Sequence, residues 1–87
     1  MRFGHKTLPS FWACYEGLPE DVRQRADKQY ERLASDPAHP SVHLKPVGQF
    51  WPARVTDAVR GLAVREENTF IWFWAGTHDE YERLLRG

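Results

Sequence analysis

The sequence has little cysteine and no long apolar run, and each absence excludes a class of protein. Cys14 is the only cysteine among 87 residues, so neither an intrachain disulfide nor a multi-cysteine metal site can form. The four histidines show no ligand spacing, so we expect no metal and no cofactor. No stretch approaches the ~20 apolar residues of a membrane span, and the start lacks the apolar run of a signal peptide. These absences predict a cytoplasmic protein without membrane contact.

The chain has no excess of positive or negative charge. Twelve lysines and arginines balance twelve acids, whereas a domain that coats nucleic acid is usually basic. The balance counts against an extended nucleic-acid surface and leaves a local one open. The charges are unevenly spread: residues 37–65 hold four cations and one acid, and residues 66–87 hold two cations and five acids.

Helical periodicity marks the first part of the chain. Apolar residues at i, i+3, i+4 and i+7 after Pro9 predict a short helix over 8–16, which Gly17 ends. A second apolar stripe and a first turn rich in acids predict a helix over 19–35, which Pro37 stops. The two-residue break between them predicts a helical hairpin.

A period of two follows and predicts strands. Four runs alternate or are apolar on both faces, at residues 41–45, 53–57, 58–65 and 69–75. The last run, rich in tryptophan and phenylalanine, should be a central strand. We expect its aromatic face to pack in the core, with a groove for a partner's amphipathic helix and a base-stacking platform as alternatives; that face comprises Phe70, Trp72 and Trp74.

The polar run after the aromatic strand has the signature of a helix start. Gly76 breaks the strand, and Thr77 with Glu80 fits a capping box, in which each side chain bonds the backbone N–H of the other. A short helix follows. The fold class is therefore α+β over one domain, residues 1–87: a helical hairpin packed on an antiparallel sheet of about four strands, with a short C-terminal helix.

This order of elements, with several short motifs, resembles the RelE/ParE superfamily of type II toxin–antitoxin toxins. The motifs are "LPEDVR" at a helix start, "DPAHPS" before "LK", the W-x-x-R-V strand, an arginine that precedes apolar residues in the next strand, and a terminal H-x-x-Y. The resemblance covers residues 8–85. It implies a cognate antitoxin as partner and, in RelE-like members, an endoribonuclease that cuts messenger RNA on the ribosome without a metal.

The resemblance also implies roles for individual residues. In this chemistry the 2′-hydroxyl of the message attacks the adjacent phosphorus, so cations must hold the phosphorane charge and other groups must move protons. By position, Arg60 matches the phosphate-stabilising arginine, and Lys45 and Arg54 match basic sheet positions near it. His78 and Tyr81 match the C-terminal positions for proton transfer or for orienting the nucleotide.

Other interpretations stay open at this point. His43 shares a strand face with Lys45 and is a second candidate for the base or for phosphate contact. Arg60 could instead pair with Asp57 or Glu66, and Tyr81 could be a core residue. ParE-like relatives use the same scaffold to bind DNA gyrase without nuclease chemistry, and an inactive relative would only bind its antitoxin.

Overall fold

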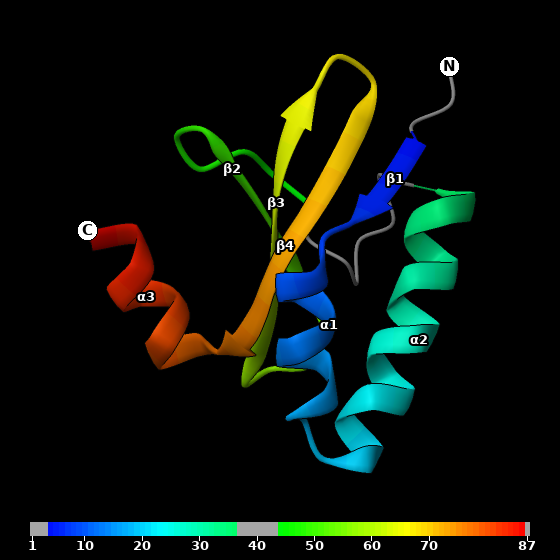
Figure 1. Cartoon of the computed structure of the whole chain (residues 1–87), viewed down its shortest axis with the longest axis vertical. Coiled ribbons are helices and arrows are strands. Elements are labelled where there is room, and N and C mark those ends of the chain that lie inside the picture. Colours follow the sequence, from blue (N-terminus) through cyan, green and yellow to red (C-terminus); the bar gives the residue numbers. More distant parts are fainter. Residues whose placement is uncertain (1–3, 37–43, 87) are drawn as a thin grey trace.

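One four-stranded sheet separates two helices on one face from a third helix on the other (Figure 1). The computed structural model describes residues 4–36 and 44–86. The elements in chain order are β1 (Gly4–Thr7), α1 (Pro9–Glu16), α2 (Glu20–Ser35), β2 (Phe50–Arg54), β3 (Val59–Glu66), β4 (Thr69–Thr77) and α3 (His78–Arg86). The expected α+β fold class is confirmed.

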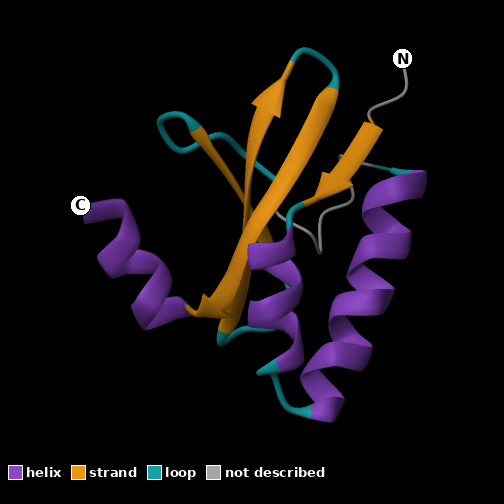
Figure 2. Cartoon of the chain, viewed as in Figure 1, coloured by secondary structure: helices purple, strands orange, loops and turns teal. Residues whose placement is uncertain are grey.

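The two N-terminal helices form the predicted hairpin (Figure 2). α1 has a proline in its first turn, and α2 begins directly after Pro19. Glu20 and Asp21 in the first turn of α2 and Arg32 in its last turn complement the helix dipole. The boundaries agree with the expected ranges to within one residue.

The sheet is mixed, where we expected it to be antiparallel. Its order is β1-β4-β3-β2, and β1 runs parallel to β4 with Gly4 opposite Thr69. The predicted strand over 41–45 is wrong in its described part, because Leu44 and Lys45 lie outside any strand. The rest of that range, including His43, lies outside the described residues. The fourth strand therefore comes from the N-terminal segment.

The strand predicted over 53–57 is displaced toward the N-terminus. β2 ends at Arg54, and the chain then turns, with the Val55 N–H donating to the Val59 carbonyl at 3.0 Å. β2 is an edge strand, which accounts for Pro52, because an edge position tolerates a missing N–H. β3 and β4 form a hairpin with a tight turn, in which Glu67 has φ 55°.

A bulge in β4 divides the aromatic side chains between the two faces. Leu62 pairs with Trp74 and Ala63 pairs with Trp72, so Phe73 is an extra residue. Phe70 and Trp72 are buried on the helix face, as expected for a core. Trp74 lies on the other face, so the prediction that it shares the Phe70–Trp72 face is wrong.

The core lies between the helices and the sheet. Leu33 from α2 meets side chains from three strands, and the buried members of this cluster are Leu33, Ala53, Ala63, Phe70 and Trp72. Trp51 packs against the cluster, with its ring centroid 5.2 Å from that of Phe70. In the described part of the chain, no helix is both long and apolar enough to span a bilayer.

Candidate active site

Two arginines face each other across the β2–β3 pair. Arg54 is the direct cross-strand partner of Arg60. Like charges in this position repel, so each guanidinium needs compensation. Arg54 forms an ion pair with Asp57 in the following turn. The structure thus assigns to Arg54 the aspartate that the sequence offered to Arg60 as an alternative partner.

The Arg60 guanidinium is held by the turn that connects the two strands. Its Nη1 donates to the carbonyl oxygen of Thr56, and to that of Val59 at 3.2 Å. Burial lowers the pKa of Arg60, the charge of Arg54 lowers it further, and Tyr81 opposes the shift. A guanidinium remains charged under these conditions. A partly desolvated cation of this kind gains more from a bound anion than a fully hydrated one does.

The arginine pair lies on the face of the sheet that carries α3. Ala53 and Gly61, adjacent to the two arginines in sequence, are buried, and Ala53 belongs to the core on the helix face. Because successive side chains on a strand alternate, Arg54 and Arg60 project from the opposite face. Figure 1 shows α3 on that side of the sheet, away from α1 and α2.

A backbone hydrogen bond connects the start of α3 to the β2–β3 turn, between the two arginines in sequence. The His78 N–H donates to the Ala58 carbonyl at 2.7 Å, in the turn between β2 and β3. The predicted capping box is confirmed: the Glu80 N–H donates to Thr77 Oγ1 and the Thr77 N–H donates to Glu80 Oε1, both at 3.2 Å. The backbone bond from Thr77 lowers the pKa of Glu80, with help from the Thr77 hydroxyl.

The two candidate residues of α3 lie together. The rings of His78 and Tyr81 have centroids 5.6 Å apart. The side chain of His78 is 42% exposed, and its Nδ1 lies 3.5 Å from Glu82 Oε1. Glu82 therefore faces the Nδ1 side of the imidazole.

Four of the six candidate residues come together. Arg54, Arg60, His78 and Tyr81 are connected through the β2–β3 turn, the start of α3 and the electrostatic interaction of Arg60 with Tyr81. Lys45 is exposed in the segment before β2, so its expected strand position is wrong. Tyr81 is half-buried, so it is neither a core residue nor a fully exposed one.

Two residues that shape this surface, Thr56 and Glu82, were not predicted from the sequence, and Asp57 was offered to the wrong arginine. Thr56 holds Arg60 through its carbonyl oxygen, which no side-chain motif reveals. Asp57 lies three residues after Arg54, and Glu82 lies four residues after His78 on a helix; both spacings are those of local pairs. Within residues 4–36 and 44–86, no cluster of three or more His, Cys, Asp or Glu side chains could hold a metal ion.

Comparisons with known proteins identify the fold. No family model and no curated protein matches the chain. Solved structures do match. RelBE2 of Mycobacterium tuberculosis, a toxin–antitoxin complex, has a TM-score of 0.70 at 14% identity, covering 90% of this chain and 100% of that one. The RelB–RelE complex of Methanococcus jannaschii has a TM-score of 0.73 at 11% identity, covering 91% and 96%.

A third solved structure agrees. The DinJ–YafQ toxin–antitoxin complex of E. coli has a TM-score of 0.70 at 10% identity, covering 92% of this chain and 97% of that one. Each likeness spans nearly the whole of both chains. The chain therefore has the RelE-like α+β fold, and the resemblance to the RelE/ParE superfamily is confirmed at the level of the fold.

Proposed function

We propose that this chain is the toxin of a type II toxin–antitoxin pair and cleaves messenger RNA on the ribosome. The toxin role is supported by the RelE-like fold, since the solved structures with this fold include RelE and YafQ in complex with antitoxins. The nuclease role is supported by one observation above the others: the Arg54–Arg60 pair stands beside the His78–Tyr81 pair on one face.

The proposed chemistry needs only groups found on this face. The 2′-hydroxyl of the message attacks the adjacent phosphorus, and the 5′-oxygen leaves, so that a cyclic phosphate remains. Arg60 stabilises the charge that develops on the phosphoryl oxygens, using N–H groups that the turn carbonyls leave free. Arg54 adds positive charge from across the strand pair.

Proton transfer is assigned to α3. His78 takes the proton from the 2′-hydroxyl or gives one to the leaving 5′-oxygen, since an imidazole can do either near neutral pH. Tyr81 orients the nucleotide through its ring and hydroxyl. Lys45 and His43 remain candidates for phosphate contacts from the segment that precedes β2.

A second function has its own support. Asp57 neutralises Arg54, the turn carbonyls already engage Arg60, and the chain has no net charge. These features favour a toxin that binds a protein target such as DNA gyrase and performs no phosphoryl chemistry. An inactive relative that only binds an antitoxin would have the same features.

The test is transcriptome-wide mapping of new RNA 5′ ends after brief induction of the chain without its antitoxin. The proposal predicts new ends inside translated codons, lost in Arg60→Ala and retained in Arg25→Ala, a matched change at an exposed arginine of α2. Growth arrest without new ends would exclude the nuclease and favour a protein target. Neither arrest nor new ends, with a folded protein, would leave only antitoxin binding.

A further inference from the structure

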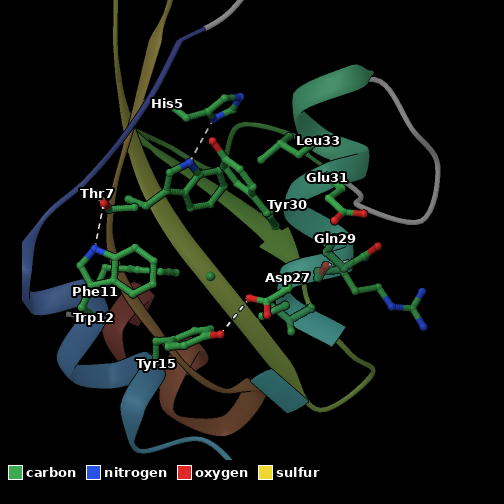
Figure 3. A pocket seen from close by; sticks show the side chains of 16 residues that line it. His5, Thr7, Phe11, Trp12, Tyr15, Asp27, Gln29, Tyr30, Glu31 and Leu33 are labelled. Atoms are coloured by element: carbon green, nitrogen blue, oxygen red, sulfur yellow. Dashed lines mark hydrogen bonds between the residues drawn. The ribbon is translucent and has the colours of Figure 1, made fainter. Parts of the chain in front are cut away.

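A cavity of about 670 Å³ lies on the helix face of the sheet, away from the proposed active site (Figure 3). It opens between α1, α2 and the strands. Leu33 and a hydrogen bond from Gln29 Nε2 to the Arg54 carbonyl, at 2.7 Å, join α2 to the sheet. The volume is within the ~300–1,000 Å³ of small-molecule sites.

Six aromatic rings line the cavity. They come from β1, α1, α2 and β4, and comprise His5, Phe11, Trp12, Tyr15, Tyr30 and Trp72. Trp12 and Tyr30 are exposed large residues, with relative accessibilities of 46% and 51%. A hydrogen bond of 2.9 Å from Trp12 Nε1 to Thr7 Oγ1 holds the indole in place.

The charges at this cavity favour a cation. Figure 3 shows the Tyr15 hydroxyl, from α1, pointing toward Asp27, from α2, and the phenol donates a hydrogen bond of 2.8 Å to the carboxylate. Glu31, one helical turn further along α2, also lines the cavity. Arg54, the cation among the lining residues, projects its side chain from the opposite face of the sheet and pairs there with Asp57.

The histidine in the wall adds no positive charge. His5 Nδ1 accepts a hydrogen bond from Trp72 Nε1 at 3.2 Å, which only the neutral ring can do. Burial also lowers the pKa of His5, so the neutral form persists to lower pH. The cavity thus combines aromatic faces, two carboxylates and a neutral imidazole.

We propose that this cavity binds a small organic cation, an ammonium group carried on an apolar body. The ammonium would lie near Asp27 and against the face of Trp12 or Tyr30, where cation–π attraction adds to the ion pair. The apolar body would fill the space over Trp72. This inference does not depend on the proposed nuclease, because it concerns the other face of the sheet.

The experiment is a titration of the full chain with 2-phenylethylamine, followed by NMR of the indole N–H resonances of Trp12 and Trp72. The uncharged analogue 2-phenylethanol is titrated in parallel. We expect saturable binding of the amine and roughly tenfold weaker binding of the alcohol, which corresponds to about 1.4 kcal/mol. Asp27→Asn should reduce amine affinity to that of the alcohol, and Asp21→Asn, on the same helix but outside the cavity, should not.

Trp12→Leu provides a second variant, at a half-exposed position where a large effect on folding is not expected. The variant should bind the amine more weakly and bind the alcohol with nearly unchanged affinity, because leucine keeps apolar contact but offers no aromatic face. Equal affinity of the wild-type chain for amine and alcohol, or no binding of the amine, would overturn the proposal. Amine binding that survives both Asp27→Asn and Trp12→Leu would also overturn it.

Discussion

At the scale of single residues, His5 joins the first strand to the centre of the sheet. Its ring accepts a hydrogen bond from Trp72 and stacks on Phe70 with centroids 5.7 Å apart. Protonation would replace the Nδ1 lone pair by an N–H and break the bond to Trp72. Separately, burial of the ring disfavours its charged form and lowers the pKa of His5 below its ordinary value of 6.5.

This shift predicts a dependence of stability on pH. Between the folded pKa and the unfolded value near 6.5, the unfolded chain binds more protons, so the free energy of unfolding falls as pH falls through that window. Above about pH 6.5 the contribution is fully present. Urea unfolding across this range should show the loss in the wild type and a smaller loss in His5→Gln. An unchanged slope in His5→Gln would contradict the account.

Gly76 supports the site at the same scale. It is opposite Arg60 in the sheet, and a Cβ there would lie 2.5 Å from the ring of Trp74. Gly76→Ala should therefore force the indole to move and destabilise the fold by about 1–3 kcal/mol, measured by urea unfolding. Gly17→Ala is the matched control, since its Cβ would make an ordinary 3.5 Å contact. Equal stability of the two variants would show that the ring moves freely.

At the scale of elements, β4 passes directly into α3. Thr77 is both the last residue of the strand and the cap of the helix. Thr77→Ala should lower the free energy of unfolding by about 1 kcal/mol, because the Glu80 N–H loses its partner. Glu80→Gln should cost less, since glutamine also completes a capping box. Thermal unfolding of the two variants checks this order, and the reverse order would contradict the role of the box.

Elements with a strong period could be predicted. Both N-terminal helices, the β3–β4 hairpin and the capped C-terminal helix agree with the pattern in the sequence. β1 was missed because four mostly polar residues carry no readable period, and only pairing with β4 makes them a strand. The run at 41–45 alternates well, but Leu44 packs against the core from outside any strand.

The site was predictable only in part. Arg60 and His78 are identified by the motifs of the resemblance, an arginine before apolar residues and a terminal H-x-x-Y. The β2–β3 register decides that Arg54 lies opposite Arg60. The sequence predicts β2 at the wrong residues, so this register could not be predicted. The position of Trp74 depends on a bulge, and one extra residue reverses the face of every side chain beyond it.

At the scale of the whole molecule, the sheet separates two surfaces of different chemistry. One face carries the Arg54–Arg60 and His78–Tyr81 pairs, and the other carries the aromatic cavity with Asp27. Changes on separate faces should act independently. Asp27→Asn should leave RNA cleavage unchanged, and Arg60→Ala should leave amine binding unchanged. A loss of both activities in either variant would show that the two faces are coupled.

The central claim concerns Arg60, and the most direct measurement is the single-turnover cleavage rate of a ribosome-bound message by the purified chain. Arg60→Ala should reduce the rate by roughly 10²–10³-fold, or about 2.7–4 kcal/mol, the usual effect of removing one donor to a developing oxyanion. Its urea midpoint should remain that of the wild type. Cleavage at the wild-type rate by a folded Arg60→Ala protein, or no cleavage by the wild type, would contradict the claim.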